Sequence, residues 1–380
     1  MTVNKIAIIM PLAEQRGGGE LMVLHLMQQG QGLGVEWLVI FLQDGPMVKQ
    51  VQNLGVAAEV IHSGQLRQVH RYLLTVLKIA RLVRRENVQM LLGWMGHAQL
   101  YGAPASRLAG IPSAWYQLGI SLNKNVFDQI STRLPTAGIL TCSQAGADAQ
   151  AAIKPKRPMR VVYPGVELER FDIDKLPTPA EAKRRLGLPL EGPIIGIVGR
   201  LQHWKGMHVL VEALPQILRA HPNAHCVLVG GDHALEPDYP AFLRTQIDRL
   251  ALADKVTLTG LQANVPEWMQ AMDVIVHASD HEPFGIVVIE AMALGKPVVA
   301  GNTAGPTEVI TDGVHGLLTP YGDAPALAGA VLRYLDDPEF ARQTGAAARI
   351  RAQEFSTRRY AENCVAALQS LMAKDGTKLA

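Results

Sequence analysis

The sequence predicts an α/β fold with two doubly wound domains, each built on a parallel β-sheet. Short apolar segments with strand character alternate with helical patterns along the 380 residues, as in right-handed β-α-β crossovers. A Pro-rich stretch at residues 176–179 separates two such series and is predicted to be a linker. The length and the 48% hydrophobic residues are sufficient for two buried sheets.

The strands are predicted from short apolar runs, and the helices from the periodicity between them. In the first series the predicted strands span residues 5–11, 36–42, 58–62, 88–94, 113–118, 138–142 and 160–163. In the second series they span residues 193–198, 225–229, 255–258, 273–276 and 297–300, and a last helix covers about residues 356–372. We therefore expect three parts: a first domain over residues 1–164, a second over 165–355, and a C-terminal helix within 356–380.

Two carboxylates lie eight positions apart in the second series, Glu282 in a turn and Glu290 inside a predicted helix. The Pro-Phe-Gly step between them suits a helix start. A helix that begins at Phe284 and Gly285 directs free backbone N–H groups and the positive end of its dipole at an anion, and a diphosphate is the natural candidate. The two glutamates then suit the hydroxyls of a nucleotide-sugar. A solvated loop and a helix-surface carboxylate are the alternative for such a pair.

Two cations, Arg200 and Lys205, follow the apolar strand predicted at residues 193–198. Open α/β sheets bind ligands at the carboxyl ends of their strands. A guanidinium and an ammonium at that edge suit a departing diphosphate, because cations stabilise charge that grows as the bond breaks. Either residue alone is explained equally well as a solvated surface cation. The cations and the glutamates together favour a diphosphate site.

With these motifs the chain resembles glycosyltransferase family 4, the retaining nucleotide-sugar transferases of GT-B fold, nearly from end to end. The run Gly-Gly-Gly-Glu at residues 17–20 follows the first strand and matches the family's Gly-Gly-x-Glu step. Residues 163–171 are similar to the interdomain signature, with Pro164 in place of the usual Asn. Residues 304–310 resemble the Gly-Gly-x-x-Glu segment, with Pro306 replacing a glycine. The resemblance implies two Rossmann-like domains facing across a cleft, and a C-terminal helix that crosses back to the first domain.

The resemblance also implies roles for the catalytic residues. Arg200 and Lys205 are expected to hold the diphosphate. Glu282 is expected to bind the donor sugar and Glu290 the ribose, while His97 contacts the donor sugar from the first domain. Since neither carboxylate is then a nucleophile, we expect front-face displacement with retention. The remaining donor-binding residues, through backbone or apolar contacts, are expected to be Gly17, Gly18, Leu261, Val265, Phe284, Gly285 and Ile286. The nucleobase is expected to rest against Leu261 and Val265, in the segment 260–266 after a predicted strand.

The expected function is transfer of a sugar from a nucleotide diphosphate donor to a hydroxyl of a glycan or lipid-linked acceptor, in cell-envelope or polysaccharide biosynthesis. A UDP-sugar is expected because UDP is the commoner donor nucleotide among similar enzymes, and a GDP-sugar is the alternative. A nucleotide-sugar epimerase of related two-domain build and a catalytically silent binding module also remain open. A dehydrogenase is disfavoured, because residues 17–19 lack the Gly-x-Gly-x-x-Gly fingerprint.

No metal or other cofactor is expected, because the acidic residues around 230–238 form no Asp-x-Asp and the two cations take the role of Mg²⁺. The cysteines Cys142, Cys226 and Cys364 lack metal-ligand spacing and are predicted to be small buried residues.

Basic residues concentrate in the first half of the chain. Residues 1–164 hold 16 Lys and Arg against 8 Asp and Glu, whereas residues 165–380 hold 20 against 26. Such asymmetry favours an anionic partner. In the helix predicted around residues 66–85, the cations form one stripe and the apolar residues, Val69, Leu73 and Leu77 among them, form an opposite face expected to join the core. The stripe consists of Arg67, Arg71, Lys78, Arg81 and Arg85.

We expect this stripe to bind an anionic membrane surface or an acidic acceptor, with an ordinary solvated face as an equally weighted alternative. Nucleic acid is not expected, because no aromatic-basic interleaving accompanies the charge. No segment reaches the roughly 18 to 20 apolar residues of a spanning helix, and the N-terminus reads as a strand and not a signal peptide. The expected location is therefore cytoplasmic, with peripheral attachment to the inner face of the membrane if the stripe binds lipid.

Overall fold

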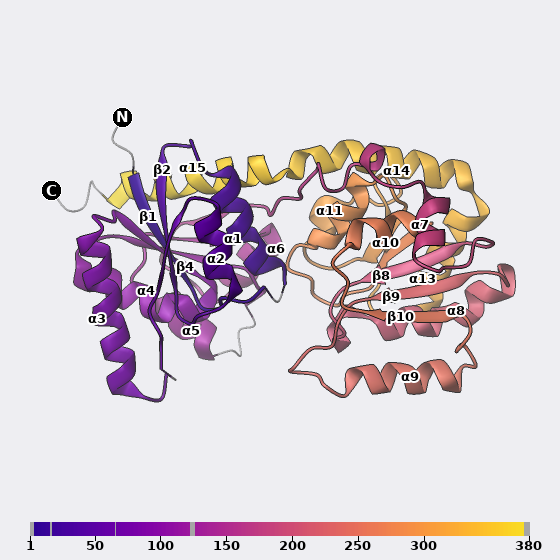
Figure 1. Ribbon diagram of the computed structural model, residues 1–380, viewed down its shortest axis with the longest axis horizontal. Coiled ribbons are helices and arrows are strands. Elements are labelled where there is room, and N and C mark those ends of the chain that lie inside the picture. The colour runs from indigo at the N-terminus through magenta and orange to yellow at the C-terminus, as the bar shows by residue number, and fades with distance from the viewer. Residues whose placement is uncertain (1–3, 16, 65, 122–125, 376–380) are drawn as a thin grey trace. The chain divides into compact units, whose positions relative to one another are not determined.

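Two parallel β-sheets organise the computed structural model, which describes residues 4–15, 17–64, 66–121 and 126–375 (Figure 1). The first sheet belongs to unit 1, which comprises residues 1–165 together with 357–380. The second belongs to unit 2, residues 166–356. The chain thus passes into unit 2 after Gly165 and returns to unit 1 at Thr357.

Unit 1 contains a seven-stranded sheet in the order β3-β2-β1-β4-β5-β6-β7, with every pairing parallel. Its interior strand β1 is covered on both faces, which explains why it reads as a continuous apolar run and not as an alternating one. The strands are β1 (Asn4–Met10), β2 (Val35–Phe41), β3 (Ala57–Val60), β4 (Met90–Trp94), β5 (Ser113–Gln117), β6 (Gly138–Thr141) and β7 (Met159–Val161). The helices between them are α1 (Gly18–Gln29), α2 (Pro46–Asn53), α3 (Val69–Arg85), α4 (Met95–Ala109), α5 (Val126–Arg133) and α6 (Gln144–Ala151).

The last helix, α15 (Thr357–Asp375), packs in unit 1, as expected for a C-terminal helix that returns to the first domain. Its side chains Tyr360, Cys364, Leu368 and Leu371 are all buried. Leu371 lies over the start of β6, where its Cδ2 is 2.5 Å from the position that a Cβ on Gly138 would take. The close approach of helix and strand therefore depends on the missing side chain at Gly138.

Unit 2 contains a six-stranded parallel sheet in the order β10-β9-β8-β11-β12-β13. The edge strand β13, which is three residues long, was not predicted. The strands are β8 (Ile194–Val198), β9 (His225–Val229), β10 (Val256–Gly260), β11 (Val274–His277), β12 (Val298–Gly301) and β13 (Leu317–Thr319). The α-helices are α7 (Pro179–Arg185), α8 (Met207–Ala220), α9 (Tyr239–Arg249), α10 (Val265–Ala271), α11 (Ile286–Ala293), α12 (Pro306–Val309), α13 (Ala324–Asp336) and α14 (Pro338–Ala352), with 3-10 turns η1 (Ile173–Lys175), η2 (His203–Lys205) and η3 (Gln353–Phe355).

Helices cover both faces of this sheet, with α9 on one side and α10 and α11 on the other (Figure 1). A core beneath α8, α9 and α13 includes Leu210, Leu214, Leu243 and Val331, all at most 1% exposed. Apolar burial of this kind contributes roughly 25 cal/mol per Å² and is the main stabilising term of the unit.

The Pro-rich stretch predicted as a linker lies inside unit 2 and leads directly into α7, so the prediction of a linker was wrong. Thr178 is the N-cap of α7: its hydroxyl accepts a hydrogen bond from the Glu181 N–H (3.4 Å), and the Glu181 carboxylate accepts one from the Thr178 N–H (2.9 Å). Pro179 occupies the first helical position, where its missing N–H does no harm. The prolines therefore begin a helix instead of separating domains.

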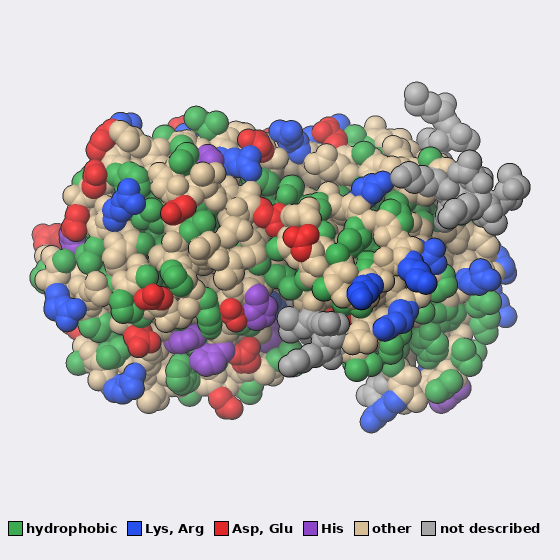
Figure 2. Space-filling view, turned by 180° about the vertical axis from the view of Figure 1, so that it is seen from behind, with side chains coloured by type: hydrophobic (Ala, Val, Ile, Leu, Met, Phe, Trp, Pro, Cys, Tyr) green, Lys and Arg blue, Asp and Glu red, His purple; other side chains and the backbone are tan. Residues whose placement is uncertain are grey.

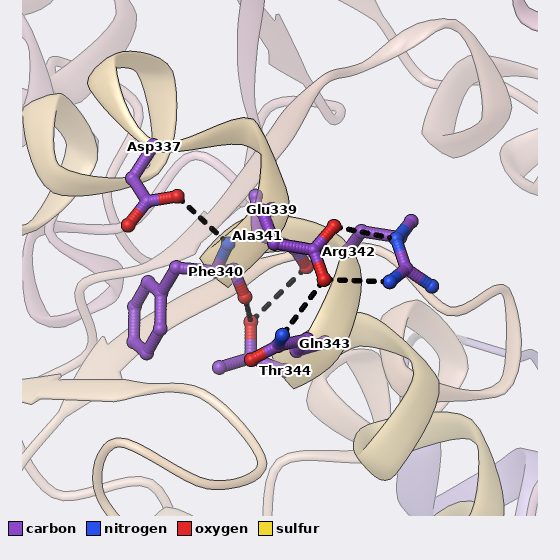
Figure 3. Close-up of polar contacts among 7 residues, drawn as sticks. All are labelled: Asp337, Glu339, Phe340, Ala341, Arg342, Gln343 and Thr344. Atoms are coloured by element: carbon purple, nitrogen blue, oxygen red, sulfur yellow. Dashed lines mark hydrogen bonds and ion pairs between the residues drawn. The ribbon is translucent and has the colours of Figure 1, made fainter.

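Helix α14 begins with a similar local arrangement (Figure 3). The Asp337 carboxylate accepts a hydrogen bond from the backbone N–H of Phe340 (3.0 Å), which caps the helix. In the first turn of the helix, Glu339 accepts two hydrogen bonds from the Arg342 guanidinium (2.9 and 2.6 Å) and one from Gln343 (2.7 Å). These exposed contacts define where the helix begins and add little stability individually.

The strand order of each sheet reverses beside its first strand. In unit 1 the reversal falls between β1 and β4, and in unit 2 between β8 and β11. Crossovers on either side of such a point leave toward opposite faces of the sheet, so a crevice opens at the carboxyl ends of the two strands. This topology selects one edge of each sheet as the place for functional residues.

We predict that Leu368→Ala lowers the free energy of unfolding of unit 1 by about 2–5 kcal/mol, because truncation of a fully buried leucine removes apolar contacts and leaves a cavity. Urea denaturation monitored by tryptophan fluorescence measures this change, with the buried Trp37, Trp94 and Trp115 as reporters. Gln369→Ala on the exposed side of the same helix is the control and shifts stability by less than about 0.5 kcal/mol. Equal stability of the two variants contradicts the packing of α15.

Candidate functional site

The loops that follow β8 and β11 meet at the reversal point of unit 2. Lys205 ends η2 after β8, and Glu282 follows β11. Gly206 has φ +72°, and a Cβ at this position would lie 1.9 Å from the carbonyl oxygen of Ala278. Glycine is therefore required where the two loops touch. This contact brings Lys205 next to Glu282, although 77 positions separate them in the sequence.

Lys205 and Glu282 form a buried ion pair, with Nζ 2.5 Å from Oε2 and side chains that are 15% and 12% exposed. His277 Nε2 lies 3.2 Å from the same carboxylate oxygen, and the Lys205 ammonium also stands over the Trp204 ring at 4.1 Å. Burial acts to raise the pKa of Glu282, but Lys205 and His277 outweigh it and hold that pKa below its ordinary value. Glu282 therefore stays ionised at neutral pH. The two residues were predicted to bind separate ligands, and their pairing could not be predicted from the sequence.

Arg200 lies at the carboxyl end of β8 and is partly buried. Its Nη1 is 3.3 Å from Nε2 of His233, which belongs to the loop after β9. Because a guanidinium only donates hydrogen bonds, this contact requires the tautomer whose proton is on Nδ1, which excludes the hydrogen bond of 3.3 Å from the Leu235 N–H to Nδ1. In that tautomer His233 orients the guanidinium. The sequence analysis did not identify it, since a lone histidine in a loop carries no signal of its partner.

Helix α11 begins at the same edge. Gly285 is its N-cap with φ +93°, and the preceding Phe284 is buried with its ring 5.7 Å from that of Phe355. The Gly305 N–H donates to the Glu282 carbonyl oxygen (3.0 Å), which holds the approach to the helix in place. The first N–H groups of α11, including that of Ile286, have no acceptor within the helix and lie at the positive end of its dipole. Phe284 contributes only backbone here, because its side chain is in the core.

Glu290 lies in the second turn of α11 and is partly buried. Burial raises its pKa to about 8; the Arg170 charge acts to lower it and the Glu167 charge to raise it. Arg170 also donates to the carbonyl oxygen of Ala263 (3.1 Å), in the loop between β10 and α10. Glu290 therefore sits beside the loop predicted to contact the nucleobase. Glu167 and Arg170 were missed as site residues, although both lie in the segment 163–171.

The predicted base-contacting residues occupy that loop and the start of α10. Leu261 is 86% exposed, and its Cβ lies 3.1 Å from where a Cβ on Gly231 would be, so the loops after β9 and β10 are adjacent. Val265 is the first residue of α10 and is partly buried. An exposed leucine at the carboxyl edge of a sheet provides an apolar surface for a flat ring.

The predicted residues of unit 1 lie at the carboxyl edge of its own sheet. Gly17 is the N-cap of α1 and Gly18 its first residue; the Trp94 Nε1–H donates to the Gly19 carbonyl oxygen (2.9 Å) and ties this turn to the end of β4. His97, in the first turn of α4, is exposed, with its ring 5.5 Å from that of Tyr101. The protein around His97 nevertheless removes enough water to lower the pKa of its imidazole, which is therefore neutral at pH 7.

Among the described residues, no group of three or more His, Cys, Asp or Glu is arranged to hold a metal ion. The sequence does contain an Asp-x-Asp that the sequence analysis overlooked, at Asp172 and Asp174. Both carboxylates lie 3.7 Å from Arg349 Nη2, and Asp172 also pairs with Lys175. The two aspartates therefore take part in ion pairs around η1. The cysteines Cys142, Cys226 and Cys364 are buried and unbridged, as predicted.

Comparison with known proteins identifies this arrangement. The family described as glycosyl transferases group 1 matches residues 180–351. An alpha-D-kanosaminyltransferase of Streptomyces kanamyceticus is 30% identical over 290 residues, which cover 70% of this chain and 73% of that protein. A lipopolysaccharide core biosynthesis mannosyltransferase, LpsB of Rhizobium meliloti (strain 1021), is 29% identical over 220 residues, 57% of this chain and 62% of LpsB. A D-inositol 3-phosphate glycosyltransferase of Acidothermus cellulolyticus is 38% identical, but the match covers only 40% of that protein's length.

Solved structures agree with the fold. Alr3699/HepE of Anabaena, determined in complex with UDP and glucose, superposes with a TM-score of 0.84 at 26% identity, over 97% of this chain and all of that one. A glycosyltransferase from Rickettsia africae superposes with a TM-score of 0.87 at 22% identity. Two Rossmann-like units with parallel sheets are the architecture of the GT-B glycosyltransferases. The chain belongs to the glycosyl transferases group 1 family.

We predict that Glu290→Gln removes a pH dependence of stability. Between about pH 4.5 and pH 8 the raised pKa keeps Glu290 protonated in the folded protein, whereas the unfolded chain has lost this proton. The free energy of unfolding therefore falls as pH rises through this window. The variant cannot ionise, so its Tm exceeds that of the wild type by more at pH 8 than at pH 5. Glu212→Gln, at an exposed position of α8, is the control. Parallel Tm profiles for wild type and Glu290→Gln refute the buried protonated state.

Proposed function

We propose that the protein is a retaining glycosyltransferase of family 4, which transfers a sugar from a UDP-sugar to a hydroxyl of a glycan or lipid-linked acceptor. One observation carries this proposal: at the reversal point of unit 2, the cations Arg200 and Lys205 and the start of α11 lie on one edge of the sheet. Fixed cations and a helix N-terminus suit a nucleoside diphosphate. That HepE was solved with UDP and glucose supports UDP over GDP as the nucleotide.

The ion pair between Lys205 and Glu282 is compatible with diphosphate binding. An ammonium has three donors, so Lys205 keeps one hydrogen bond to Glu282 and offers others to a phosphate oxygen. Glu282 in turn has lone pairs left for hydroxyls of the donor sugar, since a carboxylate accepts about four hydrogen bonds. The pair thus fixes the ammonium before the donor arrives, and charge growing on the leaving diphosphate meets a preorganised cation.

The proposed chemistry is substitution on one face of the sugar. Neither carboxylate suits a nucleophile: Glu282 is held by Lys205 and His277, and Glu290, whose burial raises its pKa to about 8, is mostly protonated at neutral pH. The bond between C1 and the phosphate oxygen breaks, a new bond forms from the acceptor oxygen to C1, and the acceptor's proton passes to the leaving phosphate. In this scheme Glu290 binds the ribose and His97 contacts the donor sugar. The anomeric configuration is retained.

Metal ions are not required in the proposed reaction. Arg200 and Lys205 supply two positive charges for the leaving diphosphate, which is the electrostatic role that Mg²⁺ has in many phosphoryl and glycosyl transfers. Backbone N–H groups at Gly18 and from Phe284 to Ile286 add further donors in this proposal.

The proposed setting is cell-envelope or polysaccharide biosynthesis, in the cytoplasm at the inner face of the membrane. The similarity to LpsB, a lipopolysaccharide core biosynthesis mannosyltransferase, supports a role in the cell envelope. The exposed cations of α3 support attachment to an anionic surface. In the part of the chain that the structure describes, every helix is too short or too polar to cross a bilayer. Attachment would accordingly be peripheral.

We predict that Arg200→Ala and Lys205→Ala each lower turnover by about 10²-fold or more, because each removes a charge that stabilises the leaving diphosphate. Release of UDP and GDP from a panel of nucleotide-sugars measures this, with and without candidate acceptors. Arg219→Ala, an exposed cation in the last turn of α8, is the matched control and retains wild-type turnover. Near-normal rates in both site variants would rule out the diphosphate assignment. Release without any acceptor would favour an epimerase or hydrolase instead of a transferase.

We also predict that the reaction proceeds in excess EDTA and converts an α-linked donor into an α-linked product. The coupling constant of the anomeric proton in the purified product reports its configuration. A β-linked product places the protein among inverting enzymes. Loss of activity in EDTA that returns with Mn²⁺ or Mg²⁺ shows that a metal takes part, and the proposal of metal independence is then wrong.

A further inference from the structure

Helix α3 of unit 1 exposes apolar side chains in its first half, from Val69 to Leu77. Val69, Leu73, Leu74 and Leu77 are 64, 53, 54 and 40% exposed. Val69, Leu73 and Leu77 were predicted to join the core, and that prediction was wrong. The buried side of α3 instead consists of Thr75, Val76, Ile79, Ala80, Leu82 and Val83. Residues of this side recur every three or four positions and pack toward α4 and the sheet, so the flank with the leucines is left uncovered.

Cations border these leucines. Arg71, Lys78 and Arg81 are exposed, and Arg67 is exposed just before the helix. None of these four cations forms a salt bridge of 4 Å or less with an acidic side chain among the described residues. Figure 2 shows the result: on the half of the molecule that carries α3, hydrophobic side chains are gathered in an area bordered by Lys and Arg.

Two other arginines at the end of α3 do not belong to this surface. Arg85, which the sequence analysis counted in the stripe, pairs with Glu59 (3.5 Å) and Glu86 (3.0 Å). Arg84 donates to the carbonyl oxygens of Leu108 and Ala109 at the end of α4. The α3 surface is therefore defined by the four exposed apolar residues together with Arg67, Arg71, Lys78 and Arg81.

We infer that the α3 surface inserts shallowly into an anionic lipid bilayer, with the leucines among the acyl chains and the cations at the headgroups. The cations alone would suit any polyanion. Exposed leucines among them gain nothing from a soluble acidic glycan or from nucleic acid, whereas a bilayer interface receives both kinds of side chain. The absence of any acidic residue from Val69 to Arg85 complements an anionic leaflet.

This inference deepens the proposed peripheral placement and rests on it for the choice of partner. It changes the expected binding mode from purely electrostatic to mixed. Attraction between exposed charges is screened at about 0.5 M salt, where the Debye length is only a few Å, but the burial of apolar area is not. A fraction of the binding should therefore survive high salt.

Sedimentation with vesicles tests the two contributions separately. The probes are vesicles of phosphatidylcholine alone and vesicles that also contain phosphatidylglycerol, each at low salt and at about 0.5 M salt. The wild type should bind the anionic vesicles at both salt concentrations, more weakly at the higher one, and bind neutral vesicles at least tenfold more weakly. The leucine variant combines Leu73→Ser, Leu74→Ser and Leu77→Ser, and the cation variant combines Arg71→Ser, Lys78→Ser and Arg81→Ser.

The leucine variant should keep binding at low salt and lose it at high salt, whereas the cation variant should lose at least about tenfold in affinity at low salt. Matched controls on unit 2 carry the same kinds of change at exposed positions and should bind like the wild type. The apolar control combines Leu190→Ser, Val314→Ser and Ile350→Ser, and the basic control combines Arg219→Ser, Arg244→Ser and Arg249→Ser.

Insertion can also be observed directly. Leu74→Cys introduces an exposed thiol. The three native cysteines are buried, so an environment-sensitive fluorophore labels the new thiol selectively. The emission should shift to the blue on addition of anionic vesicles at high salt. A matching label at Ile350→Cys, which is 75% exposed on α14, should show no shift.

Several results would overturn the inference. Wild-type protein that binds neither vesicle, or a leucine variant that matches the wild type at high salt, excludes insertion. An oligomer in light scattering that the leucine substitutions dissociate, without any vesicle binding, assigns the surface to a second copy of the chain. Sugar transfer to a short water-soluble acceptor should be unaffected by every α3 substitution. This readout separates failure of the membrane inference from failure of the proposed transferase function.

Discussion

The ion pair between Lys205 and Glu282 is the interaction on which the arrangement of the candidate site depends. It joins the loops after β8 and β11 at the reversal point of the unit 2 sheet, with both side chains mostly buried. Removing one partner of such a pair leaves an uncompensated charge and typically costs about 3–5 kcal/mol. His277 and the Trp204 ring supply further favourable contacts to the two charges. The pair therefore maintains a charged, preorganised site in the absence of any ligand.

Backbone geometry makes this pairing possible. Gly206 lets the loop after β8 approach Ala278 at a distance that a side chain would block, and Gly285 adopts the left-handed conformation from which α11 departs. Gly305 packs against Phe284, so that the first turn of α11 is supported from the core. Each glycine acts where two segments of backbone touch. The position of the charged groups thus follows from close backbone contacts at the edge of the sheet, and the helix dipole of α11 adds to the cationic character of that edge.

Charge and burial are distributed differently in the two units. Unit 2 buries its functional charges and shifts their protonation, lowering the pKa of Glu282 through Lys205 and His277 and raising that of Glu290 through burial. Unit 1 instead exposes cations and leucines together on α3, an arrangement that is unfavourable in water unless an interface receives it. A donor site needs desolvated groups at fixed positions, whereas a membrane contact needs exposed apolar area and a net positive charge. These two kinds of surface match the roles that we propose, donor binding for unit 2 and membrane attachment for unit 1.

The amino-acid sequence by itself determined the α/β class, most of the strands and the residue types of the donor site. Strand alternation is a local property, and the motifs around Arg200, Lys205, Glu282 and Glu290 are short and keep their spacing. Only the tertiary structure decided which of these groups meet. The partners of Lys205 and Arg200 are 77 and 33 positions away, and no periodic pattern reports such a distance.

The dependence on contacts between distant segments also explains which predictions from the sequence were wrong. The edge strand β13 was missed, and Pro179 of the predicted linker begins α7 because Thr178 and Glu181 cap the helix. The helical period of α3 showed two faces, but not how far neighbouring elements cover its apolar side. Coverage depends on segments distant in sequence, here α4 and the sheet beneath it. Local periodicity therefore determined the elements, and packing between distant segments decided which side chains pair, which are buried and which remain exposed to a partner.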